Sequence, residues 1–169
     1  MEGAFVTTSE PTTQDDGGTA SATPPARLPQ SKEEVRARRE ELRAALIELE
    51  DALSGPAGDP DHWARRVEAG IERMHQTLRT HISDTEAEGG MLPQVEEDAP
   101  WLEGRVELLR SEHADLHART EQLLAHCRDG DVEQVRDEAL ELLRAISRHR
   151  QRGTDLLWDA YMVDISAAD

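Results

Sequence analysis

Four histidines stand at positions where an amphipathic helix normally carries apolar side chains. They are His81, His113, His117 and His149, and they fall on three different predicted helices. A polar ring that recurs on the apolar stripes of several helices indicates side chains that converge inside a bundle. Because imidazole is a common ligand of transition metals, this pattern predicts a shared metal site.

The spacing of two of these histidines supports that interpretation. His113 and His117 are four residues apart, which turns an α-helix by about 400° and places both rings on one face, one turn apart. Paired histidines are also common on helix surfaces, so the informative feature is their position on an apolar stripe. His149 precedes Gly153 by four residues, and a residue without a side chain leaves room beside the ring.

A metal site of this kind also needs carboxylates, and two acids are the first candidates. Glu86 follows His81 by five residues, and Asp155 follows His149 by six, which is about one and a half turns in each case. Taken singly, each acid is more typical of a solvated helix surface than of a metal ligand. We select Glu86 and Asp155 because each follows its histidine along the same helix.

Three further residues near these positions are expected to stay outside the site. Asp84 and Glu112 are interpreted as solvated surface acids. His75 precedes His81 by six residues, about 240° around the helix. It is therefore expected to miss that face, with a place at the edge of the stripe as a substitute ligand as the alternative.

Capping residues and helix breakers divide the chain after residue 30 into four segments. The predicted starts are Ser31, Asp59-Pro60, Asp98 with Pro100, and Asp131; the predicted ends are Ser54-Gly55-Pro56, Gly89-Gly90, Gly130 and about residue 160. Glu34 and Gln134 complete capping boxes with Ser31 and Asp131. Apolar residues recur with helical periodicity in every segment, and no strand pattern is found. The sequence predicts an all-α fold, an up-down-up-down antiparallel four-helix bundle.

Composition separates residues 1–30 from residues 31–169. The first thirty residues are rich in Thr, Ser, Pro, Gly and Ala, and we expect them to form a disordered tail before a single bundle domain. The net charge of −17 opposes binding to nucleic acid or to anionic membranes. No secretory signal or membrane-length apolar run is present, and the one cysteine, Cys127, fits a cytoplasmic location.

Motifs of the common enzyme classes are missing from the sequence. There is no nucleophile elbow, phosphate-binding loop, dinucleotide fingerprint or cysteine-based zinc pattern. The Glu-x-x-His pairs of di-iron carboxylate enzymes are also missing, because Leu78, Arg110, Ala114 and Ile146 precede the four histidines by three residues. We therefore expect a binding protein and not an enzyme.

Three segments carry a resemblance to a known family. They are TLRTHISDTE around His81, LLRSEHADLH around His113 and His117, and LLRAISRHRQRGTDLLWDAY around His149. Over residues 31 to about 160 the chain resembles the hemerythrin-like, or HHE cation-binding, proteins. That resemblance implies a four-helix bundle around a carboxylate-bridged di-iron centre, which in typical members binds dioxygen or senses oxygen, nitric oxide or redox state.

The chain departs from the family pattern in three places. The family's first-helix histidine is missing from RARREELRAAL, Thr85 stands where the second-helix carboxylate is expected, and Gly153 and Thr154 stand where the fourth-helix carboxylate is expected. The predicted metal ligands are His81, Glu86, His113, His117, His149 and Asp155. They are expected to bind iron, as one ion or as a di-iron centre, with a small gaseous molecule as the further ligand.

The same departures support an alternative hypothesis. Arg38 or Arg39 could take the place of the missing imidazole and pair with Glu86 or Asp155. The protein would then be a metal-free helical bundle that acts as a structural or protein-interaction module.

Overall fold

Helices account for nearly all of the structure. The computed structural model describes residues 32–129 and 131–162. Its elements are α1 (Lys32–Ser54), α2 (Pro60–Glu86), the short α3 (Met91–Asp98), the 3-10 turn η1 (Pro100–Leu102), α4 (Glu103–Asp129) and α5 (Val132–Tyr161). The all-α prediction is confirmed for these residues, in which no strand occurs. The predicted disordered tail, residues 1–30, lies outside the described residues, as do Ser31 and Gly130.

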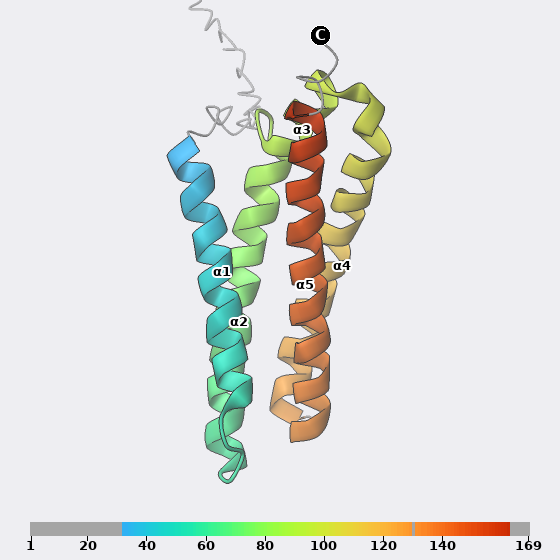
Figure 1. Cartoon of the computed structure of the whole chain (residues 1–169). Coiled ribbons are helices and arrows are strands. Elements are labelled where there is room, and N and C mark those ends of the chain that lie inside the picture. Colours follow the sequence, from blue (N-terminus) through green and yellow to red (C-terminus); the bar gives the residue numbers. More distant parts are fainter. Residues whose placement is uncertain (1–31, 130, 163–169) are drawn as a thin grey trace, which may run out of the picture.

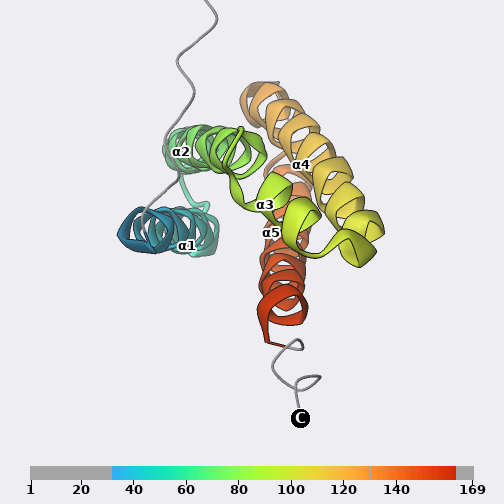
Figure 2. The same ribbon diagram turned by 90° about the horizontal axis from the view of Figure 1, so that it is seen from above.

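The four long helices lie side by side, and the short elements join two of them at one end. In Figure 1 the sequence colours run down α1, up α2, down α4 and up α5, while α3 and η1 link α2 to α4. The view along the helices in Figure 2 places α1 beside α2, and α4 beside α5. Contacts are extensive between α1 and α2, α2 and α4, and α4 and α5, whereas α1 and α5 touch only sparsely.

The start of α2 follows the predicted signal. The Asp59 carboxylate accepts a hydrogen bond of 3.1 Å from the backbone N–H of His62, and Pro60 occupies the first helical position. Asp131 is also the N-terminal cap of α5, but its side chain makes no capping hydrogen bond. Gln134 donates to Glu138 instead, so the predicted capping box at this helix was wrong.

The segment between α2 and α4 differs most from the sequence prediction. We expected a plain connection through Met91 and Leu92, with a helix starting at Asp98 and Pro100. The structure instead has α3 ending at Asp98, and α4 begins at Glu103. Leu92 is fully buried, so packing against the bundle stabilises a helix too short to be stable alone.

A glycine pair makes the turn that ends α2. Gly89 has φ of 75°, which lies in the left-handed region. A Cβ on Gly90 would come within 2.6 Å of the carbonyl oxygen of Asp84 and 2.7 Å of that of Thr85. The close approach explains why the predicted helix breaker at Gly89-Gly90 needs glycine.

The apolar core consists of two clusters along the bundle axis. The larger cluster joins α1, α2, α4 and α5, and the smaller joins α3, η1, the start of α4 and the end of α5. Leu109 belongs to the smaller cluster and Leu116 to the larger, with His113 between them on α4. On α5, His149 likewise lies between Ile146 and Leu156. The two buried histidines therefore occupy the boundary between the clusters.

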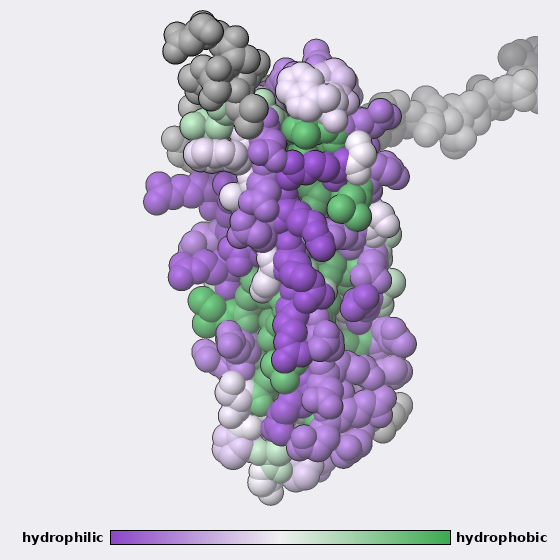
Figure 3. Space-filling model, turned by 45° about the vertical axis from the view of Figure 1, so that its right-hand side comes forward, coloured by the Kyte–Doolittle hydropathy of each residue, from purple (hydrophilic) through white to green (hydrophobic). Residues whose placement is uncertain are grey.

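Hydrophilic side chains cover most of one face of the molecule (Figure 3). Figure 3 shows one face on which polar residues predominate and apolar residues are visible only between them. Within the described part of the chain, no helix combines the length and hydrophobicity needed to cross a membrane.

Candidate metal centre

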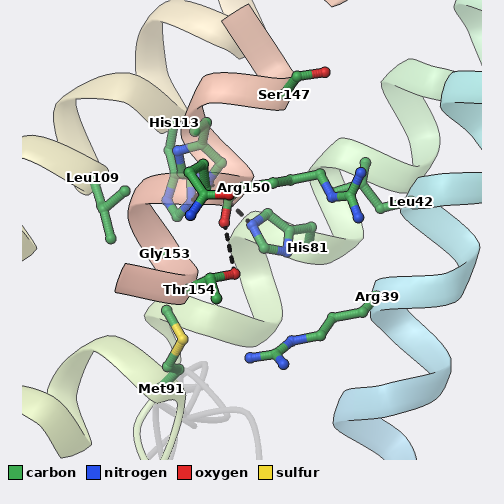
Figure 4. A pocket seen from close by; sticks show the side chains of 12 residues that line it. Arg39, Leu42, His81, Met91, Leu109, His113, Ser147, Arg150, Gly153 and Thr154 are labelled. Atoms are coloured by element: carbon green, nitrogen blue, oxygen red, sulfur yellow. Dashed lines mark hydrogen bonds between the residues drawn. The ribbon is translucent and has the colours of Figure 1, made fainter. Parts of the chain in front are cut away.

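Three of the four predicted histidines meet inside the bundle. His81 comes from α2, His113 from α4 and His149 from α5, and we call them the histidine triad. The Nε2 atom of His149 lies 3.1 Å from that of His113 and 3.3 Å from that of His81. His113 and His149 are buried, with exposed fractions of 2% and 4%. Figure 4 shows His81 and His113 directed toward one another.

Two carboxylates hold the outer nitrogen atoms of the triad. Nδ1 of His113 lies 2.5 Å from a Glu86 carboxylate oxygen, and Nδ1 of His149 lies 3.0 Å from a Glu112 oxygen. A carboxylate accepts a hydrogen bond, so each Nδ1 carries the proton and donates. Arg152 donates to the other oxygen of Glu112, which fixes that carboxylate in place.

The Nδ1 contacts determine which form of each ring faces the interior. In a neutral imidazole with its proton on Nδ1, Nε2 carries a lone pair. His113 and His149 therefore direct two lone pairs at one another across 3.1 Å. Only His81, whose Nδ1 makes no such carboxylate contact among the described residues, can present an N–H to them. A cation between the rings would satisfy the remaining lone pairs.

Burial keeps the triad neutral. Desolvation, followed by the nearby charges of His113 and His149, lowers the pKa of His81 to about 3. Burial likewise lowers the pKa of His113 to about 3, with His149 and Arg110 adding to the effect. Burial also lowers the pKa of His149, although Glu112 opposes this shift. Neutral imidazole is the form that binds metals.

The triad fits one metal ion and does not fit a carboxylate-bridged pair of ions. One nitrogen atom from each ring lies within 4.8 Å of the others, close enough to hold a single ion. A bridged pair would need carboxylate oxygens facing the triad. The Glu86 carboxylate contacts the outer nitrogen of His113 instead. Thr85, which stands at the expected position of the second-helix carboxylate, donates to the carbonyl oxygen of His81.

A cavity of about 250 Å³ gives access to the triad. All five α-helices contribute to its lining, and it lies where α1 and α5 are loosely packed. In Figure 4, Arg39 reaches toward this space from α1, while Gly153 and Thr154 line it from α5. A Cβ on Gly153 would meet no atom within 4 Å, in agreement with the room that the sequence predicted beside His149.

Two predicted ligands lie away from the triad, and a third reaches it only from outside; these positions correct the sequence prediction. His117 is turned away from the triad and lies against His75, with their Nε2 atoms 3.4 Å apart. Asp155 is exposed and accepts a hydrogen bond from Gln151, one turn earlier on α5. Glu86 does reach the site, but through the outer nitrogen of His113 and not toward its centre.

The predicted arginine contacts were also wrong. Arg38 pairs with Asp84 and not with Glu86 or Asp155. Its Nε lies 3.0 Å from a carboxylate oxygen of Asp84, whose side chain is 4% exposed. Arg39 lines the cavity near His81. Asp84 is therefore buried and forms an ion pair with a residue of α1, and it is not the solvated acid that we expected.

Two contacts within the candidate site region were missed because they join different helices. Glu112, interpreted as a surface acid, reaches from α4 to His149 on α5. His75 was expected to miss the stripe but faces His117 on α4. The predicted antiparallel arrangement could have indicated the second contact, because α2 and α4 run in opposite directions (Figure 1). A step from His113 forward to His117 on α4 therefore corresponds to a step from His81 back to His75 on α2.

Comparisons with protein-family models, with curated proteins and with solved structures found no match to this chain.

Proposed function

We propose that this protein is a divergent hemerythrin-like bundle, of up-down-up-down antiparallel topology, that binds one iron ion through His81, His113 and His149. It is a cytoplasmic binding protein and not an enzyme, and it has no affinity for nucleic acid or membranes. Its task is the handling or sensing of oxygen, nitric oxide, iron or redox state. The carboxylate-bridged di-iron centre of the family is not part of this proposal, because Glu86 and Asp155 do not face the triad.

One observation carries the proposal: three imidazoles, two of them buried, meet at their Nε2 atoms, while the carboxylates of Glu86 and Glu112 contact the outer nitrogen atoms of two of the rings. Carboxylates that accept from the outer nitrogen of a ligating histidine fix the ring orientation and make the inner nitrogen a stronger ligand. Without a cation, the N–H of His81 can satisfy only one of the two facing lone pairs, and the other would be buried and unsatisfied, which is costly. The arrangement is therefore better suited to a bound ion than to an empty core.

The residues around the triad support the binding of a small molecule. Imidazole suits iron and zinc alike, and the family resemblance favours iron. A bound iron ion would supply an open coordination position for a ligand such as dioxygen or nitric oxide. The cavity beside the triad is large enough for such a molecule, and Leu42, Met91 and Leu109 make part of its lining apolar.

Metal content tests the proposal. The protein would be purified from iron-supplied cells, under air and anaerobically, and treated with a mild chelator to strip exposed ions. We expect about one iron ion per chain with a visible absorption band, and loss of both in H113A. H126A is the matched control, since His126 lies on the same helix and also contacts a carboxylate, that of Glu138. Iron missing from both preparations would contradict the proposal.

The alternative is a metal-free bundle that serves as a structural or interaction module. Two large aromatic side chains favour it, because Trp101 and Trp158 are 66% and 61% exposed and exposed aromatic residues are typical of protein contact sites. This alternative predicts the same melting temperature with Fe(II) as with a chelator. A ligand that binds only the folded state raises stability, so a clear increase would exclude the alternative.

A further inference from the structure

A second cluster of metal-ligating side chains lies outside the histidine triad. It consists of His75 on α2 and of His117 and Glu121 on α4. One ligand atom from each residue lies within 4.8 Å of the others. We call this group the outer cluster. Among the described residues, none of its side chains makes a hydrogen bond, ion pair or ring contact with the triad, so it can be considered as a site of its own.

The two imidazoles of the outer cluster face each other. Their Nε2 atoms are 3.4 Å apart, and their ring centroids are 5.0 Å apart at an interplanar angle of 59°. The tilt excludes a parallel stack, and the short distance between the Nε2 atoms lets both approach one ion. Because the rings come from two helices that already pack together, little conformational freedom remains to be lost when both bind one ion.

Glu121 completes the donor set. It follows His117 by one helical turn, and its carboxylate lies 3.5 Å from the outer nitrogen of that ring. The side chain is 58% exposed, so it can rotate to an ion at the cluster without leaving a packed environment. Two imidazoles and one carboxylate are the ligand types preferred by divalent transition metals of intermediate softness.

The location of the outer cluster favours cation binding. His75 and His117 are only partly buried, so an ion can reach them directly from solvent. The protein carries a net charge of −17, which raises the local concentration of cations.

We propose that His75, His117 and Glu121 form a second metal site, which binds a divalent transition-metal ion such as Zn²⁺ at the bundle surface. This site does not depend on the proposed iron site, because it shares no ligand with the triad. His113 and His117 lie one turn apart on α4, so the two sites are neighbours along the same helix. The outer site is the more accessible and exchanges its ion faster.

The test is calorimetric titration of the full chain with Zn²⁺ at pH 7.5, with helicity checked by circular dichroism. We expect two equivalents of Zn²⁺ for the wild type, one for H75A and one for H117A, with E121Q weakening the outer site at least tenfold. H126A is the control and should keep both equivalents, because His126 has a carboxylate partner but no second imidazole among the described residues.

The variants distinguish failure of one site from failure of the other. A single wild-type equivalent that H75A abolishes and H113A leaves intact would support the outer site and reject the triad. A single equivalent that H113A abolishes and H75A leaves intact would overturn the outer site. Unchanged binding in both H75A and H117A, with wild-type helicity, would overturn it as well.

Discussion

Two glutamates determine how the buried histidines present their nitrogen atoms. Glu86 contacts the outer nitrogen of His113, and Glu112 contacts that of His149. Glu86 was predicted from the sequence to be a direct ligand. Its contact with the His113 ring means that it would support a ligand of the proposed metal and not bind the metal itself. Both residues therefore act through a histidine, by setting its tautomer and its orientation.

Replacing Glu112 should weaken metal binding without abolishing it. In E112Q, the neutral amide polarises the ring of His149 less strongly, and the pair with Arg152 is lost. We expect a 10- to 100-fold weaker affinity, which is the usual effect of removing such a partner. E107Q is the matched control on the same helix, because Glu107 is 73% exposed and has no contact with the triad. Competition with a chromophoric chelator measures both variants; equal affinities would contradict the role of Glu112.

The buried histidines should also make the metal-free protein sensitive to acid. The pKa of His113 is about 3 in the folded state and about 6.5 when the chain is unfolded. Between these values the unfolded chain binds a proton that the folded protein does not, so stability falls as the pH decreases. The expected slope is about 1.4 kcal/mol per pH unit for each such histidine.

Urea unfolding of metal-free protein at pH 7.0 and pH 4.5 measures this effect. Because carboxylates also titrate in this range, the relevant quantity is the difference between the wild type and H113L. Between pH 7.0 and pH 4.5, we expect the free energy of unfolding to decrease by about 2–3 kcal/mol less in H113L than in the wild type. An equal loss in both proteins would show that His113 is not held neutral by the fold.

At the scale of the elements, the helices differ in how closely their backbones approach each other. Gly70 on α2 faces Leu49 on α1, and a Cβ there would lie 3.2 Å from a Leu49 methyl carbon and 3.4 Å from its Cα. Gly153 on α5 faces the cavity and has no neighbour within 4 Å of the same position. The first glycine permits close helix packing, whereas the second leaves space beside the triad.

This difference predicts opposite outcomes for two alanine substitutions. G153A gains helix propensity without a clash and should raise the free energy of unfolding by about 0.5–1 kcal/mol. G70A has the same propensity gain, but it must displace Leu49 and should be less stable than G153A. Thermal unfolding of the metal-free variants measures the difference. G70A as stable as G153A would contradict the close contact of α1 and α2.

The long helices could be predicted from the sequence because their signals are local. The Asp59-Pro60 start and the Gly89-Gly90 end depend on residues within one turn of each boundary. The short helix α3 has no comparable signal, and Pro93 and the nearby Pro100 suggest a loop. It exists because Leu92 and Val95 are buried against the bundle, which is a tertiary effect.

At the scale of the whole molecule, the partners of each histidine depend on the relative register of the helices. The apolar stripes correctly indicated that His81, His113 and His149 point inward. They also placed His117 in the same site, because residues four apart share a face. Only the register of α2 against α4 separates them, since it brings His81 to His113 and His75 to His117. No local pattern contains that information.

The division of the core into two clusters gives the molecule a polar layer between them. His113 and His149 fill this layer together with His81, and the cavity opens from it toward α1. A polar layer inside an apolar bundle is costly unless its groups are paired. The metal proposed for the triad would therefore contribute to the stability of the whole bundle as well as to its function.

Anomalous X-ray diffraction from crystals of the iron-loaded protein tests the central claim most directly. Data recorded on both sides of the iron absorption edge identify the element and locate it relative to the side chains. The structure predicts a peak within bonding distance, about 2 Å, of Nε2 in His81, His113 and His149, with Glu86 and Glu112 still on the outer nitrogens. A triad without an anomalous peak at full iron loading, or iron bound only at other residues, would contradict it.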